Sequence, residues 1–153
     1  MNFFRLLVSI SIPIYVGLLG SMASLNAIPN WYDNLNKPIF TPPNWLFGPV
    51  WTILYTLMGI SVYLVWNSKH QDLRKSLAIF WIHLVFNGIW SPIFFGLKNP
   101  ELALLNIIII LIFIIILIYR FWKINKTASL LLFPYLIWVM YATALNAAIV
   151  IMN

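Results

Sequence analysis

The most informative polar residues lie together in the third long apolar run of the chain. His83, Asn87, Trp90 and Ser91 follow one another at spacings of three and four, which bring them to one face of a helix. In apolar surroundings an amide such as Asn87 is costly unless it is paired, so this face must point into the protein. Two interpretations stay open: Asn87 joins helices by hydrogen bonds, or it offers a hydrogen bond to a bound molecule.

Aromatic side chains form helical stripes on two other apolar runs. The stripes are Phe47, Trp51, Tyr55 and Met58 on one run, and Tyr135, Trp138, Ala142, Leu145 and Asn146 on the other. Trp51 and Trp138 each lie about two helical turns from a run end, too deep for the interfacial belt that tryptophan usually occupies. Two indoles at a similar depth would form flat walls for a planar ligand, although a packed core explains the periodicity equally well.

The ionisable residues argue against conventional catalysis. The three carboxylates, Asp33, Asp72 and Glu101, all fall outside the apolar runs or at their ends, and the chain has no cysteine. His83 is the one ionisable side chain well inside a run, and a neutral, hydrogen-bonded histidine is favoured over a proton relay or haem ligand. We therefore expect no metal site, no required cofactor, and no acid-base pair or nucleophile of the usual kinds.

Composition and run length predict the fold. Hydrophobic residues make up 63% of the chain and charged residues 8%, far from the mixture of a soluble domain. A helix needs about 20 mostly apolar residues to cross a bilayer. Five runs qualify, at residues 3–25, 45–66, 76–97, 102–122 and 130–152. We predict an all-α integral membrane protein, a bundle of five transmembrane helices that forms a single domain over residues 1–153.

Basic residues predict how this bundle lies in the membrane. Seven of the nine lysines and arginines fall on the side of the amino terminus. The positive-inside rule then puts the amino terminus in the cytoplasm and the carboxyl terminus outside. The basic residues occupy short gaps between apolar runs, so no nucleic-acid partner is expected. No transit peptide precedes the first run, which favours a bacterial cytoplasmic membrane over an organelle.

The longest connection, residues 26–44, then lies on the outer side. It contains Trp31, Tyr32 and Phe40 together with four prolines. Such a composition is typical of an ordered segment resting at the membrane interface. We expect this segment to act as a lid.

Three long motifs resemble those of one known family. The first is Lys37-Pro38 followed by Pro42-Pro43-x-Trp45-x-Phe47-Gly48-Pro49-Val50-Trp51-Thr52-x-Leu54-Tyr55-x-x-Met58-Gly59. The second is Asn87-x-x-Trp90-Ser91-Pro92-Ile93-Phe94-Phe95-Gly96, and the third is Pro134-Tyr135-x-x-Trp138-x-x-x-Ala142-Thr143-x-Leu145-Asn146. They closely resemble the TspO/MBR family, the translocator proteins once called peripheral benzodiazepine receptors, over nearly the whole chain.

The resemblance implies a five-helix bundle, commonly a homodimer, that binds porphyrins and isoquinoline or benzodiazepine compounds in a cavity closed by the first long loop. It implies Trp51 and Trp138 as cavity walls. Together with the aromatic and polar stripes, it gives the expected ligand-binding residues Tyr32, Phe47, Trp51, Tyr55, Asn87, Trp90, Ser91, Trp138, Ala142 and Leu145. The sterol-recognition pattern of animal members needs a tyrosine and an arginine near the carboxyl terminus, and residues 147–153 contain neither.

Three functions are compatible with these features. The leading hypothesis is a membrane protein that binds a tetrapyrrole, such as protoporphyrin or haem, in order to sense, sequester or move it. The second is light- and oxygen-dependent degradation of bound porphyrin, with Trp51 and Trp138 as oxidisable neighbours. The third is a scaffold in the lipid bilayer whose aromatic stripes are only packing and which binds no small molecule.

Overall fold

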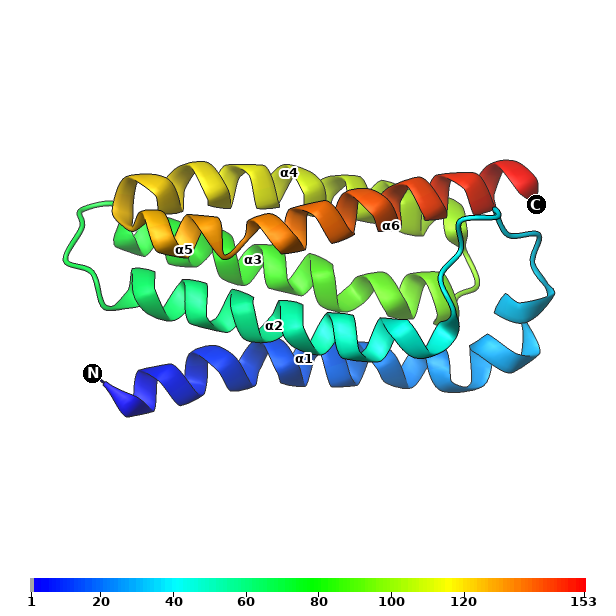
Figure 1. Ribbon diagram of the computed structural model, residues 1–153, viewed down its shortest axis with the longest axis horizontal. Helices are drawn as coiled ribbons and strands as arrows, with labels where there is room; N and C mark the ends of the chain where they lie inside the picture. The colour runs from blue at the N-terminus through cyan, green and yellow to red at the C-terminus, as the bar shows by residue number, and fades with distance from the viewer. Residues whose placement is uncertain (1) are drawn as a thin grey trace.

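The computed structural model describes residues 2–153 and contains five long helices that lie side by side (Figure 1). The elements in chain order are α1 (Phe3–Asn30), the 3-10 turn η1 (Tyr32–Asn34), α2 (Asn44–Trp66), α3 (Leu73–Ser91), the π-helical segment η2 (Pro92–Gly96), α4 (Pro100–Ile124), α5 (Lys126–Leu130) and α6 (Phe133–Met152). Five helical stretches are long and apolar enough to cross a membrane. The predicted all-α, five-helix architecture is confirmed.

Local sequence accounts for the starts of several helices. The Asn99 side chain accepts a hydrogen bond from the backbone N–H of Leu102 at 2.9 Å, and Pro100 occupies the first turn of α4, where no N–H is needed. The Asn125 side chain accepts from the N–H of Ala128 at 3.0 Å and so begins α5. These caps satisfy amides that would otherwise lack partners at the ends of the spans.

Two predicted boundaries were wrong. Helix α1 continues to Asn30, five residues beyond the apolar run, and includes Pro29, so the lid is shorter than residues 26–44. The apolar run ends where lipid ends, but a helix can continue into the interface because water and side chains satisfy its backbone there. The last span begins earlier, at Lys126, and breaks between α5 and α6, where Pro134 lies in the first turn of the new helix.

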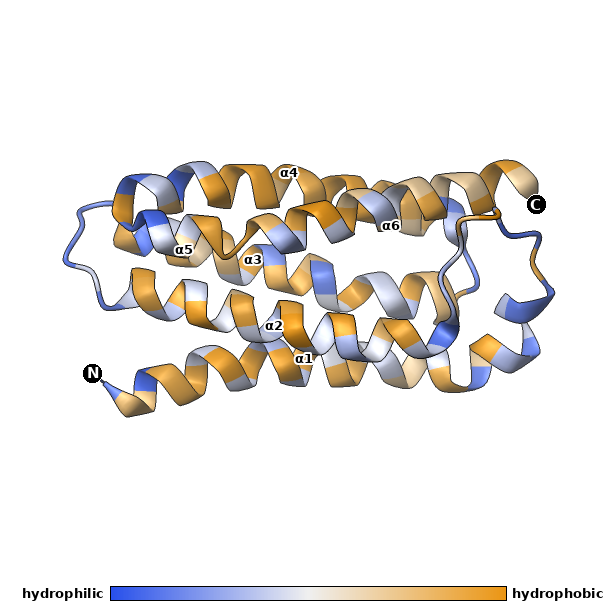
Figure 2. Cartoon of the chain, viewed as in Figure 1, coloured by the Kyte–Doolittle hydropathy of each residue, from blue (hydrophilic) through white to orange (hydrophobic). Residues whose placement is uncertain are grey.

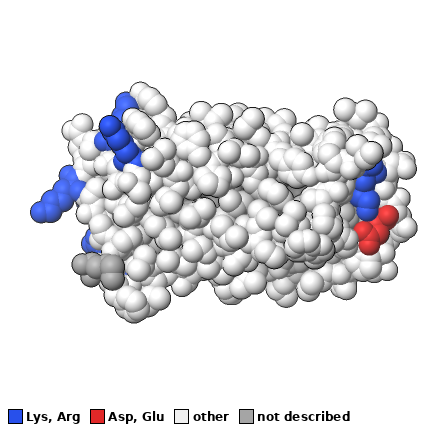
Figure 3. All heavy atoms as spheres, in the orientation of Figure 1, with Lys and Arg blue, Asp and Glu red and all other residues white. Residues whose placement is uncertain are grey.

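Hydrophilic residues concentrate at the two ends of the bundle, and the middle is mostly apolar apart from a polar part of α3 (Figure 2). Lysines and arginines gather at the end that carries the amino terminus, which we call the basic end (Figure 3). The opposite end carries the chain segment 31–43 and the carboxyl terminus, and we call it the lid end. This distribution is the one that a membrane-spanning bundle requires.

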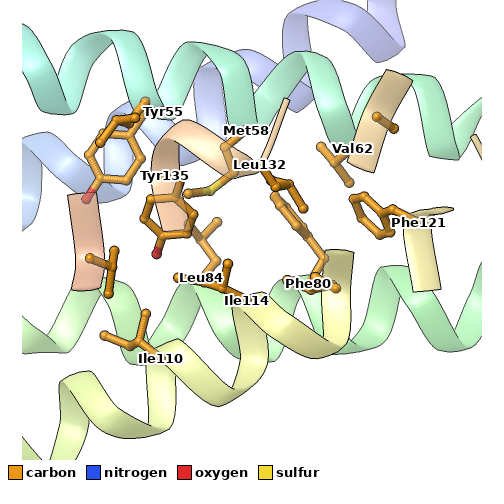
Figure 4. Packing of buried hydrophobic residues seen from close by; sticks show 14 of the residues in the cluster. Tyr55, Met58, Val62, Phe80, Leu84, Ile110, Ile114, Phe121, Leu132 and Tyr135 are labelled. Carbon is orange, nitrogen blue, oxygen red and sulfur yellow. The ribbon is translucent and has the colours of Figure 1, made fainter. Parts of the chain in front are cut away.

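The half of the bundle nearer the basic end is tightly packed. Val62 of α2, Phe80 of α3, Phe121 of α4 and Leu132 from the turn before α6 are almost completely buried (Figure 4). Around the bundle, α1 packs on α2 and α3, α4 packs on α3 and α6, and α6 makes only a small contact with α2. Because α2 and α6 make only this small contact, free volume remains between helices in the half of the bundle nearer the lid end.

Candidate ligand cavity

A cavity of about 340 Å³ lies between the helices in the lid half of the bundle. Its wall is built by α1, α2, α4 and α6 and by the end of α3 with η2, and Tyr32 of η1 closes part of it. Most of the lining is apolar or aromatic. This size and composition are typical of sites for small organic molecules.

Two indoles from different helices border the cavity. Trp51 of α2 stacks on Tyr55, with ring centroids 5.4 Å apart and planes inclined by 28°. Trp138 of α6 meets Phe47 of α2 edge to face, with centroids 6.1 Å apart. Each indole is therefore supported by another ring and still borders the free volume. Aromatic walls of this kind favour a flat, polarizable ligand.

A buried polar network limits the cavity toward the basic end. The Tyr55 hydroxyl donates to Asn87 Oδ1 at 2.7 Å, and Asn87 Nδ2 donates to the Tyr135 hydroxyl oxygen at 2.7 Å. His83 Nε2 lies 2.8 Å from the same Tyr135 oxygen, and both of these residues are fully buried. The network joins α2, α3 and α6, so the amide does connect helices. Asn87 also lines the cavity, so the same amide that connects the helices borders the free volume.

The lid is held over the cavity by the side chains of Tyr141 in α6 and of Asn153 directly after it. Asn153 Oδ1 accepts from the N–H of Asn36 at 3.0 Å, and Asn153 Nδ2 donates to the Asn36 carbonyl at 3.0 Å. The Tyr141 hydroxyl donates to the carbonyl of Phe40 at 2.5 Å. The lid that the sequence predicted is thus an ordered segment tied to the last helix.

Tyr32 anchors the lid on the end of the third span. Its side chain is 3% exposed and packs edge to face on Phe94 and Phe95 of η2. Burial, together with the nearby Asp33 carboxylate and Tyr141, raises the pKa of Tyr32 to about 12. The ring is therefore neutral at physiological pH and behaves as part of the apolar cover.

Comparison with known proteins finds similarity along nearly the whole chain. The sequence model of the TspO/MBR family matches residues 9–152. The chain belongs to the TspO/MBR family. A protein named "Tryptophan-rich protein TspO" from Archaeoglobus fulgidus is 43% identical over 153 residues, covering 100% of this chain and 99% of that relative. A "Tryptophan-rich sensory protein" from Cereibacter sphaeroides is 36% identical, covering 86% of this chain and 84% of its own. The human "Translocator protein" is 35% identical, covering 76% of this chain and 70% of its own.

In this TspO/MBR family member, all ten residues predicted to bind a ligand lie on the wall of this cavity. They are Tyr32, Phe47, Trp51, Tyr55, Asn87, Trp90, Ser91, Trp138, Ala142 and Leu145. Two other members of the aromatic stripes do not reach it. Met58 is fully buried in the packed core, and Tyr135 belongs to the polar network. Ligand binding by the ten remains a prediction.

Helix α1 contributes a wall that the sequence analysis missed. Gly17, Gly20, Ser21 and Ser24 all line the cavity. A Cβ atom on Gly17 would lie 2.2 Å from the Tyr55 ring, so the glycine is what lets this tyrosine fit. Ser91, which was predicted as a site residue, donates its hydroxyl to the carbonyl of Gly20 at 2.7 Å. The missed signal was the helical spacing of small residues on one face.

Titratable groups offer the cavity little conventional chemistry. Among the described residues, no group of three or more histidine, cysteine, aspartate or glutamate side chains could hold a metal ion. His83 is engaged with Tyr135 and lies beneath the cavity. This arrangement can enclose a flat molecule and orient it through a few polar atoms.

Proposed function

We propose that this TspO/MBR protein binds a planar tetrapyrrole of the porphyrin class in the cavity of its lid half, and that it senses or moves this ligand at the membrane. The observation that carries the proposal is the position of Trp51 and Trp138, on separate helices, at the border of one apolar cavity. Flat aromatic compounds of the isoquinoline and benzodiazepine classes would suit the same aromatic cavity walls.

The physical match is between a broad apolar ring system and aromatic walls. Burial of apolar surface contributes about 25 cal/mol per Å², so a large flat ligand gains several kcal/mol from contact with the walls. Association also loses rotational and translational freedom, which brings the expected affinity to about the micromolar range. The hydroxyl and amide groups of Ser91 and Asn87 border the same space and can bond to polar edges of the ligand.

The names of two relatives support the proposed roles of sensing and of moving the ligand. One relative is named a sensory protein and another a translocator protein. A membrane location of the site supports either role, because a hydrophobic tetrapyrrole partitions into lipid. We further propose that the basic end lies in the cytoplasm and that the lid end lies outside, on the basis of the seven basic residues at the basic end.

The test is saturable binding of protoporphyrin to the protein in nanodiscs, followed by the change in porphyrin absorbance and fluorescence. Trp51→Leu/Trp138→Leu should lose saturable binding and keep its helical content. The matched control is Trp45→Leu/Trp122→Leu, which also removes two indoles but at exposed positions outside the cavity. It should bind like the wild type.

Unchanged binding by the Trp51→Leu/Trp138→Leu protein would contradict the proposed site. If the wild-type protein itself showed no saturable uptake of any tetrapyrrole or isoquinoline compound, the scaffold function would take precedence.

A further inference from the structure

The exposed part of the cavity wall lies in one place. Most lining residues are buried or partly buried. Among the described residues, the exposed ones that line the cavity are Leu18 and Ser21 of α1 and Asn44, Gly48 and Thr52 of α2. The cavity therefore opens between α1 and α2, on the side of the bundle that faces lipid.

We infer that this opening, which we call the lateral portal, is the route by which ligand enters from the bilayer. The inference rests on the proposed function, since it concerns the path to the same cavity. Gly48 and Thr52 lie about 6 Å and 12 Å along α2 from its first residue, Asn44, at the 1.5 Å rise of a helix. The portal thus lies within the membrane half nearer the lid end.

The interface between α1 and α2 changes character along its length. Toward the basic end, a Cβ atom on Gly59 would lie 2.6 Å from the Cα atom of Ile10, so the two backbones are in close contact. Arg5 also donates to the carbonyl of Trp66 at 3.2 Å. At the portal, a Cβ atom on Gly48 would meet nothing within 4 Å. The two helices are closed at one end of their interface and open at the other.

Hydrogen bonds at the portal leave the two helices free of each other. The Ser21 hydroxyl donates to the carbonyl of Leu18 at 2.7 Å, and the Thr52 hydroxyl donates to the carbonyl of Gly48 at 2.9 Å. Each bond stays within its own helix. At the same level α1 is tied to the third span instead, through Ser91 and Gly20. Separation of α1 from α2 at the portal therefore breaks none of these bonds.

The other possible entrance is closed. Tyr32 of the lid is buried, and the lid is tied to the end of the chain through Asn36 and Asn153 and to α6 through Phe40 and Tyr141. Entry through the lid would break these bonds, and it would require an apolar ligand to arrive through water. Entry through the portal requires neither, because a hydrophobic ring system already resides in the acyl chains.

The test is the association rate of protoporphyrin with the protein in nanodiscs, measured by rapid mixing. Gly48→Trp fills the portal and should slow association about tenfold, because binding then needs a displacement of the new side chain. Release of bound porphyrin should slow as well, because the ligand leaves through the same opening, whereas a variant that only weakened binding would release it faster. Thr52→Phe is a second variant with the same expectation. Ile53→Trp is the matched control, since Ile53 is 59% exposed on the same helix but does not line the cavity.

A second experiment fixes the lid in place with a disulfide. The chain has no cysteine, so Asn36→Cys/Asn153→Cys can form a single disulfide across the lid contact. Association should be equally fast in the oxidised and reduced forms. Slower association on oxidation, or wild-type rates in both Gly48→Trp and Thr52→Phe, would overturn the portal. Absence of saturable binding by the wild type would instead refute the proposed function, so the two failures are distinguishable.

Discussion

The two halves of the bundle use the same kinds of apolar residue but differ in packing. In the basic half, side chains such as Phe80, Val62 and Phe121 are completely buried between the helices. In the lid half, the helices surround a cavity of about 340 Å³. Lipid provides little hydrophobic drive for helix association, so packing and hydrogen bonds must hold the bundle together. The packed half stabilises the fold and leaves the other half free to be hollow.

The boundary between the halves is the polar network of Tyr55, Asn87, Tyr135 and His83. These groups bond to one another, so they hold three helices at a fixed separation without filling the space beyond them. The cavity lining loses van der Waals contacts that a ligand can restore. Ligand binding and stability are therefore expected to respond to different residues, and the following variants test that separation.

Truncation in the packed half should have the largest effect on stability. Phe80→Ala removes a fully buried ring and should lower the free energy of unfolding by about 3 to 5 kcal/mol. Phe47→Ala, at the cavity wall, should cost less than about 1 kcal/mol because the ring already borders free volume. Unfolding in a denaturing detergent measures both. Equal losses would show that the halves are packed alike.

The two glycines of α2 should respond in opposite directions. Gly59→Ala places a methyl group against the α1 backbone and should destabilise the protein by about 1 to 3 kcal/mol. Gly48→Ala has room for its methyl group and should stabilise the helix by about 0.5 to 1 kcal/mol. The same unfolding assay applies. A destabilised Gly48→Ala protein would indicate that α1 and α2 are closed at the portal.

Loss of the amide at the boundary should have an intermediate effect. Asn87→Leu removes the acceptor of the Tyr55 hydroxyl and one partner of Tyr135, while His83 still pairs with Tyr135. The expected cost is about 1 to 2 kcal/mol, since hydrogen bonds between membrane helices are individually modest. Thermal denaturation followed by circular dichroism measures it. An unchanged melting temperature would show that Asn87 does not hold the helices together.

The smallest effect concerns the lid and is confined to alkaline pH. The pKa of Tyr32 is about 12, above the ordinary 10.0 of tyrosine, so the folded protein favours the protonated, neutral hydroxyl. The contribution of this raised pKa to the free energy of unfolding is fully present below pH 10 and is lost as the pH rises through 12. The difference between the tyrosinate titrations of the wild type and Tyr32→Phe should have its midpoint near 12. A midpoint near 10 would place this ring in water.

The sequence was sufficient for the fold because apolar run length determines a membrane span almost directly. It was less informative at the ends of spans. The helical part of α1 beyond the apolar run depends on local bonds such as that from the Asn30 side chain to the Asn26 carbonyl. Hydropathy does not report such bonds.

The aromatic and amide parts of the candidate site were also predictable, since large and polar side chains are conspicuous in a span. The contribution of α1 was not, because Gly17 and Gly20 act through the absence of a side chain. The tie between Asn36 and Asn153 joins residues 117 positions apart in an otherwise ordinary loop and terminus. Only the three-dimensional arrangement brings such a pair together.

The central claim is that a planar ligand occupies the hollow half between Trp51 and Trp138. A structure of the protein determined with bound protoporphyrin tests it most directly. We predict ring density in the cavity in contact with both indoles, and an unchanged basic half. Density only on the outer, lipid-facing surface, or a cavity closed by side chains with the two indoles in mutual contact, would contradict the account.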